Sequence, residues 1–391
     1  MKKNLQLSLV KKIINIVKQN KNLNNSIHEP YFDKSEKKVL NSCIESSYVS
    51  TVGPFVKKFE NLIKKFTGAK YVVATVNGIS ALHISMIVSN VSKNDEVLIP
   101  SLNYVGSSNA ASYCGAIPHF IDSRKDSFEI DVLKLRNYLL KVCKVYKNKC
   151  INKKTNRIIK AIVPTHILGH VSDMDSLLKL SKEFKLKIIE DSAECVGSYY
   201  KGKHAGTIGL IGILSFNGNK IITTGGGGAI LTNNKKAAQE ARHLTQIGKI
   251  EHQWRYHYDV MGFNYKMPNI NAAIGCAQMK KIKFLLRKKR NIFYNYYNKL
   301  KNDKNFRIVK EPKKCKSNYW LNAIILKKSN QKIIDVICKK TYQNDVHVRP
   351  LWQLVNEIPY FKKNPKMDLS NSKNINKKTL CLPSSPNSIK L

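Results

Sequence analysis

Apolar residues in this chain form short runs that alternate with stretches of helical spacing. The expected elements are helix 56–66, strand 71–76, helix 78–88, strand 96–100, a helical stretch to about 113, strands 117–122 and 158–166, helix 174–184 and strand 187–191. Strands separated by helices of this length are typical of βαβ units. A parallel sheet is covered on both faces, which explains why these strands are apolar throughout. The pattern predicts an α/β fold with a large, doubly wound, mainly parallel sheet.

The character of the chain changes after about residue 208. Strand-like segments 211–216 and 228–232 flank a glycine cluster, and a long basic helix pattern at 270–300 leads into a mixed α+β tail. We expect a basic N-terminal extension at 1–27, a large domain at 28–264 and a smaller C-terminal domain at 265–391. The apolar residues of the extension have helical spacing, which predicts a short amphipathic helix appended to the fold. The basic segment 142–154 is interpreted as a surface insertion.

The composition argues against several classes of protein. Of the 391 residues, 42% are hydrophobic and 24% are charged, so the chain can bury a core. No stretch of about 18 residues lacks polar groups, which argues against a membrane span. Lys11 and Lys12 interrupt the apolar residues near the N-terminus, which argues against a secretory signal. The nine cysteines lack the close CxxC spacing of a zinc site, and we expect reduced thiols, no metal and a cytoplasmic location.

The net charge of +42 is unusual for a chain of this length. Such an excess is compatible with nucleic acid, an acidic membrane surface or an anionic substrate as a partner. The excess is spread along the chain and is mostly lysine, without a basic stripe interleaved with aromatic residues. A compositional bias with solvated lysines and a functional electropositive face therefore both remain open, and no nucleic-acid module is recognisable.

Two strand ends carry candidate binding groups. Gly78 lies between a strand and a helix, where a close backbone approach and the free N–H groups of the helix can bind phosphate. An ordinary turn capped by Asn77 is the alternative. Asp191 ends strand 187–191, at the sheet edge where open parallel sheets bind ligands. Its alternative role is to cap a following helix, with Glu194 three residues later as in a capping box.

Lys220 has an uncommon context in this lysine-rich chain. Apolar residues precede and follow it, and a run of four glycines at 225–228 lies shortly after it. A lysine shielded from water can act as a nucleophile or form a Schiff base. A phosphate cradle, a strand-end aspartate and such a lysine together are what pyridoxal 5′-phosphate requires. The sequence therefore predicts this cofactor.

Longer segments resemble the DegT/StrS family of sugar aminotransferases. The likeness extends from about residue 27 to the C-terminus and includes SFNGNKIITTGGGGAILTNN (215–234), IIEDSAECVGSYYKGKHAGTIG (188–209) and MGFNYKMPNINAAIGCAQM (261–279). The segments IHEPYF (27–32), SNYWLNAIIL (317–326) and VRPLWQLVNEIP (348–359) are most similar to the aminotransferases of legionaminic acid and bacillosamine biosynthesis. The resemblance implies a fold-type I pyridoxal phosphate-dependent transferase.

The resemblance also implies a role for individual residues. Lys220 matches the lysine that forms the Schiff base, and Asp191 matches the partner of the pyridine nitrogen. Glu194 stands where many relatives have Gln or His near the 3-hydroxyl group of the cofactor. The remaining matches are Tyr104 for stacking on the ring, Gly78, Ile79 and Ser215 for the phosphate, Asn264 as a residue lent by a partner subunit, and His347, Arg349 and Trp352 for the sugar nucleotide.

The function implied is amino transfer, from L-glutamate, to a 4-keto-6-deoxy nucleotide sugar. The subgroup suggests a UDP-linked 2-acetamido-4-keto-2,6-dideoxy hexose as acceptor and a homodimer with shared sites, used for bacterial surface glycans. One alternative is a dehydratase or deoxygenase of the same fold, which typically has His in place of the lysine. The other is a non-catalytic nucleic-acid-binding protein on this scaffold.

Overall fold

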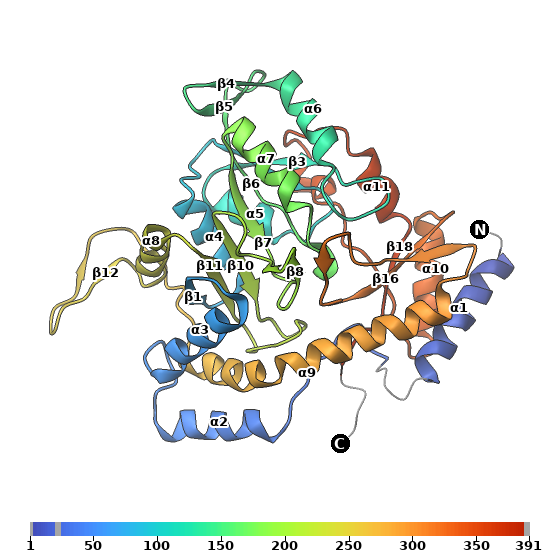
Figure 1. The fold of residues 1–391 in the computed structure, drawn as a ribbon, viewed down its shortest axis with the longest axis horizontal. Helices are drawn as coiled ribbons and strands as arrows, with labels where there is room; N and C mark the ends of the chain where they lie inside the picture. Colours follow the sequence, from blue (N-terminus) through green and yellow to red (C-terminus); the bar gives the residue numbers. More distant parts are fainter. Residues whose placement is uncertain (1–2, 20–24, 387–391) are drawn as a thin grey trace.

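The computed structural model describes residues 3–19 and 25–386, and its centre is the predicted mainly parallel sheet (Figure 1). The central strands follow the spatial order β1-β11-β10-β7-β6-β2-β3. Neighbours from β10 through β7, β6 and β2 to β3 are parallel, whereas β11 is antiparallel to both β1 and β10. Their bounds are β1 Tyr71–Thr75, β2 Glu96–Pro100, β3 Ile117–Ile121, β6 Ile158–Ile162, β7 Lys187–Asp191, β10 Ile211–Ser215 and β11 Gly228–Thr232.

Helices cover both faces of this sheet, because alternate strand residues point to opposite sides. Val73, Ile99 and Ile213 pack in one cluster with α4 (Gly78–Val88), α5 (Gly106–Tyr113) and α8 (Lys235–Thr245). Residues of the opposite parity pack against α3 (Pro54–Thr67) and α9 (Asn269–Leu300) at one end of the sheet, and against α6 (Val132–Val142) and α7 (Met174–Phe184) at the other. The strands predicted at 96–100 and 187–191 are confirmed to the residue, and the helices predicted at about 78–88 and about 174–184 are confirmed.

A second, smaller sheet follows the long helix α9. Its order is β14 (Phe306–Ile308), β16 (Asn322–Leu326), β18 (Thr379–Leu382) and β17 (Arg349–Pro350), and α10 (Gln331–Tyr342) packs in the same core. The predicted N-terminal helix is confirmed as α1 (Lys3–Lys18). Its apolar face is buried in this core, so the prediction that the helix is only appended to the fold is wrong, and the helix is an integrated part of the C-terminal layer (Figure 1). The predicted domain boundaries themselves stay a prediction.

The interpretation of 142–154 as a surface insertion was incomplete. This segment forms the hairpin β4 (Cys143–Tyr146) and β5 (Lys149–Asn152), and β5 pairs with β6 of the large sheet. Cys143 and Cys150 are buried there, while the lysines of the hairpin face solvent. The segment was not predicted as a strand because the residues on its outward face are polar, although the residues on its other face are buried.

The remaining elements are two helices, short strands and 3₁₀ turns that surround these two layers. They are α2 (Lys34–Glu45), β8 (Tyr199–Tyr200), β9 (Lys203–His204), β12 (Lys249–Ile250), β13 (His257–Tyr258), β15 (Cys315–Lys316), α11 (Ser370–Asn376) and the 3₁₀ turns η1 (Ile167–Gly169), η2 (Val355–Glu357) and η3 (Pro359–Phe361). Within the described residues, no helix has the length and apolar character needed to cross a bilayer.

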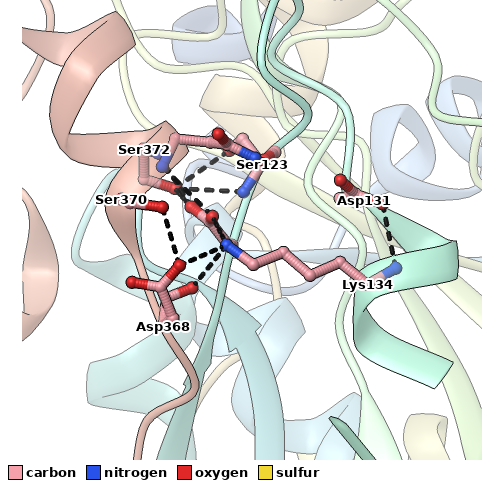
Figure 2. A network of polar contacts seen from close by, with 8 residues as sticks. Ser123, Asp131, Lys134, Asp368, Ser370 and Ser372 are labelled. Atoms are coloured by element: carbon pink, nitrogen blue, oxygen red, sulfur yellow. Dashed lines mark hydrogen bonds and ion pairs between the residues drawn. The ribbon is translucent and has the colours of Figure 1, made fainter. Parts of the chain in front are cut away.

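The chain after β17 returns to the large sheet and is fixed beside β3 (Figure 2). Lys134 of α6 donates to the carboxylates of Asp122 at 2.5 Å and Asp368 at 2.7 Å. Ser372 donates to Asp122 and accepts the Ser123 N–H group. Asp122 and Ser372 of this network are buried and Asp368 is exposed, and together these contacts anchor the segment that carries α11. Trp352, in the loop before this segment, lines the candidate site.

Candidate active site

A cavity of about 320 Å³ lies at the carboxyl ends of β10, β7 and β6, beside the N-terminus of α4. Residues from segments far apart in the sequence line it, which is the arrangement expected at the strand ends of an open α/β sheet. A groove of about 660 Å³ lies on the surface between α3 and α8, but none of the predicted site residues lines it. The smaller cavity is therefore the candidate active site.

One end of the cavity has the features of a phosphate cradle. Asn77 caps α4, because its Oδ1 accepts the Ser80 N–H at 2.8 Å, and the helix starts at Gly78. Gly78 and Ile79 line the cavity opposite Ser215. A Cβ atom on Gly78 would lie 3.1 Å from the Ser215 Cβ, so a side chain there would crowd the cradle. The Asn77 cap is therefore confirmed, and the binding of an anion at the same turn, which the cap does not exclude, stays a prediction.

Asp191 lies in the floor of the cavity and is 6% exposed. Its Oδ2 accepts the Ser107 hydroxyl at 2.5 Å, and its Oδ1 accepts the Ala193 N–H at 3.3 Å. No helix begins directly after Asp191, since the next element of the described chain is the strand β8, so the capping alternative is wrong. The carboxylate is oriented by these contacts and is available to a cationic group of a ligand.

Lys220 follows β10 in a turn, and its amine reaches the same cavity. Its Nζ lies 3.9 Å from the centre of the Trp320 ring and 3.7 Å from Oε1 of Glu194. Trp320 is fixed in turn, because its indole N–H donates to the Asn219 carbonyl at 2.7 Å. The last glycine of the run packs closely against the backbone before α4. A Cβ atom on Gly228 would lie 2.5 Å from the backbone carbonyl oxygen of Asn77, so a side chain would not fit there.

Glu194 is a buried carboxyl group beside this lysine. Burial raises its pKa from 4.5 to about 7, although the Lys220 ammonium and the Leu168 N–H act in the opposite direction. That N–H donates to Oε2 of Glu194 at 2.7 Å. Glu194 can therefore hold or release a proton near neutral pH, within reach of the amine.

The cavity contains eight of the eleven predicted site residues and leaves three outside its lining. The eight are Gly78, Ile79, Tyr104, Asp191, Glu194, Ser215, Lys220 and Trp352. Asn264 is exposed and pairs with Gln246. The half-buried His347 stacks on Tyr342, and Arg349 is exposed on β17. Because a single chain is described, the predicted roles of these three residues stay predictions.

Several lining residues were not selected from the sequence. Trp320 lay inside a motif used for the family likeness, but nothing in the sequence placed its ring over Lys220. Asn103 and Thr165 also line the cavity. The sequence offered one indication for each of them: Asn103 is next to Tyr104, and Thr165 follows strand β6. Trp352 lies at the mouth, with its ring centre 6.4 Å from that of Tyr104.

The residues present fit pyridoxal 5′-phosphate. The cradle accepts an anion, Asp191 can pair with a protonated ring nitrogen, and Lys220 is the adjacent amine. The buried, unpartnered side-chain polar atoms of Asn103 and Thr165 provide further groups for a polar ligand. An α/β sheet with this set of residues at its strand ends defines a pyridoxal phosphate-dependent transferase.

The chain belongs to the DegT/DnrJ/EryC1/StrS aminotransferase family, whose model matches residues 30–389. It is 33% identical to GDP-perosamine synthase of Escherichia coli O157:H7 over 335 residues, covering 86% of each chain. It is 30% identical over 364 residues to the putative pyridoxal phosphate-dependent aminotransferase EpsN of Bacillus subtilis strain 168, covering 92% of this chain and 90% of EpsN.

Solved structures have the same fold. The aminotransferase TlmJ from Streptoalloteichus hindustanus superposes with a TM-score of 0.82 at 24% identity, covering 92% of this chain and 93% of TlmJ. Helicobacter pylori PseC superposes with a TM-score of 0.81 at 23% identity, covering 93% and 94%. The predicted fold, cofactor and enzyme class are confirmed: this chain is a pyridoxal phosphate-dependent sugar aminotransferase. The particular likeness to the legionaminic acid and bacillosamine pathways stays a prediction.

Proposed function

We propose that this enzyme transfers an amino group from L-glutamate to C4 of a nucleotide-linked 4-keto-6-deoxy sugar, for the synthesis of surface glycans. The observation that carries this proposal is the single cavity that joins Lys220, Asp191 and the phosphate cradle under an aromatic mouth of Tyr104 and Trp352. Aromatic faces suit the apolar side of a sugar ring or a nucleotide base. The intact Lys220 argues against the dehydratase alternative, whose members typically have His there.

The cofactor supplies an electrophilic carbon and an electron sink when it is bound. Lys220 is positioned to take a proton from the glutamate Cα with its amine and to return one in the second half-reaction. Asp191, oriented by Ser107, would pair with the ring nitrogen of the bound cofactor and favour its protonated form. Trp320 covers one side of the lysine amine and reduces its contact with water. One site that serves both substrates in turn implies ping-pong kinetics.

The nucleotide of the acceptor distinguishes two versions of this proposal. Short motifs in 27–32, 317–326 and 348–359 favour a UDP-linked 2-acetamido sugar. Relatives named GDP-perosamine synthase are similar over most of the chain, which favours a GDP-linked acceptor. We rank the GDP-linked acceptor first, because that likeness covers 86% of this chain, whereas the motifs are short segments.

The test is a set of paired reactions analysed by mass spectrometry. The holoenzyme is incubated with glutamate and either a GDP-linked or a UDP-linked 4-keto-6-deoxy sugar, and the amino sugar product is measured. A Lys220→Ala enzyme serves as the matched control. Absence of a product with both nucleotides would refute the substrate class, and a product with UDP alone would reverse our ranking. A purified protein without an absorbance band near 400–430 nm that instead bound duplex RNA would support the nucleic-acid alternative.

We also propose that the enzyme works as a homodimer with shared sites. Asn264 lies outside the cavity of its own chain, as a residue lent to a partner would. The nearby hairpin of β12 and β13 projects from the body beside α8 (Figure 1). On it and just after it, Trp254, Tyr256 and Met261 are 71%, 76% and 84% exposed, and such a patch favours contact with another protein surface.

Subunit complementation tests the shared site. A Lys220→Ala chain and an Asn264→Asp chain are each expected to be inactive, the second because its charge repels the cofactor phosphate. Mixing and exchange should restore part of the activity, because some hybrid sites hold both native residues. Inactivity of the mixture, after exchange has been demonstrated by mass spectrometry, would refute the sharing of sites.

A further inference from the structure

Asn103 and Thr165 are two buried polar residues of the cavity wall with no assigned role. Their side chains are almost inaccessible, at 1% and 6% exposure of the residue. The amide nitrogen and oxygen of Asn103 and the hydroxyl oxygen of Thr165 have no hydrogen-bond partner among the described residues. A buried polar group without a partner is unfavourable, because it has lost its hydrogen bonds to water and gained none in the protein. Two such groups in one cavity wall therefore indicate a ligand that binds them.

The order of the strands shows which part of the ligand these groups can reach. The phosphate cradle is formed at β1 and β10, and Asp191 ends β7, the next strand. Thr165 follows β6 and pairs with Asp191, and Asn103 follows β2, the strand beyond. The succession along the sheet edge is therefore the cradle, Asp191, Thr165 and Asn103. The two residues lie on the side of Asp191 that is away from the phosphate cradle.

The cofactor has one polar group on that side. The 5-methylene phosphate and the 3-hydroxyl are on opposite sides of the line from the ring nitrogen to C4. With the phosphate in the cradle and the ring nitrogen at Asp191, the 3-oxygen faces the end of the cavity formed by β6 and β2. We propose that Asn103 and Thr165 donate hydrogen bonds, from the side-chain amide and the hydroxyl, to the 3-oxygen of the cofactor.

This assignment explains why both groups are neutral donors. The cofactor 3-oxygen carries negative charge in its ionised form, and an amide N–H or a hydroxyl stabilises it at any pH at which the enzyme is folded. Glu194 lies in the same cavity, but with its pKa raised to about 7 it can donate to that oxygen only in its protonated form. The proposal depends on the cofactor of the family and is independent of the sugar acceptor.

A binding cycle with the apoenzyme tests the proposal without turnover. The ligands are pyridoxamine 5′-phosphate, which cannot bond to the Lys220 amine, and its analogue that lacks the 3-hydroxyl. Quenching of the fluorescence of Trp320 and Trp352, which line the cavity, reports the dissociation constants. We expect Thr165→Val and Asn103→Leu each to bind the natural cofactor about tenfold more weakly. Both variants should bind the analogue with wild-type affinity.

The matched control is Ser108→Ala. Ser108 is buried and its hydroxyl also lacks a partner in the described chain, but it does not line the cavity, so its loss should leave both affinities unchanged. Equal weakening of both ligands by Thr165→Val and Asn103→Leu would overturn the proposal, since the residues would then act on the fold. Unchanged cofactor binding with a raised KM for the keto-sugar would also overturn it and assign the two residues to the substrate.

Discussion

Replacing Glu194 with glutamine tests how the buried carboxyl group of the cavity affects the folding stability of the protein at different pH values. Burial raises the pKa of Glu194 from 4.5 to about 7 against the opposing effect of Lys220, while the charge of Asp191 acts with burial. The folded protein therefore binds one more proton than the unfolded chain between these pH values. The stabilisation is complete below about pH 4.5 and is lost as the pH rises through 7. The difference between the two pKa values corresponds to about 3 kcal/mol of folding free energy.

The assay is chemical unfolding of the apoenzyme at pH 5 and pH 8, for the wild type and Glu194→Gln. Glutamine can still accept the Leu168 N–H, but it has no proton to lose. The variant should therefore gain stability relative to the wild type, by about 2.5 kcal/mol, between pH 5 and pH 8, because a small part of the effect already lies below pH 5. Glu357→Gln, on the exposed surface, is the control and should not reproduce this change. An equal stability difference between variant and wild type at both pH values would refute the reasoning.

Three further predictions concern residues that act on the cofactor or the substrate. Lys220→Ala should abolish turnover while the protein still binds the cofactor in equilibrium dialysis. Activity within about tenfold of the wild type, about 1.4 kcal/mol of barrier, would assign the role to another lysine. Asp191→Asn should lower the rate on the order of 100-fold with an unchanged circular dichroism spectrum, because an amide stabilises a protonated ring nitrogen poorly; a near-normal rate would contradict this. Arg349→Lys should raise the KM for the keto-sugar nucleotide without changing the glutamate half-reaction, because lysine cannot grip a phosphate in a bidentate way; an unchanged KM would remove Arg349 from the site.

The sequence pattern was sufficient for the elements of the large sheet and failed at its edge. Strands such as Glu96–Pro100 and Lys187–Asp191 are buried on both faces, so their apolar runs are unambiguous. The strand Lys149–Asn152 is short, basic and only partly buried, so its pattern resembled that of a loop. Likewise, nothing local in 365–376 indicates that this segment returns to β3, because the network of Lys134, Asp122 and Ser372 joins positions far apart in the chain (Figure 2).

The residues of the candidate site also fall into two groups, those that could be selected from the sequence and those that only the structure placed in the cavity. Lys220, Asp191 and Gly78 could be found from the sequence because each depends on local context: a glycine run, a strand end and a helix start. Trp320, Asn103 and Thr165 could not, since their roles depend on which strands are neighbours and on what their side chains lack. The sequence by itself determined the class of enzyme and its cofactor, because the candidate cofactor residues are defined by local context and the longer motifs resemble the family. The tertiary structure alone decided which side chains enclose the lysine and which polar groups remain for a ligand, because burial and hydrogen-bond partners are properties of the packed chain.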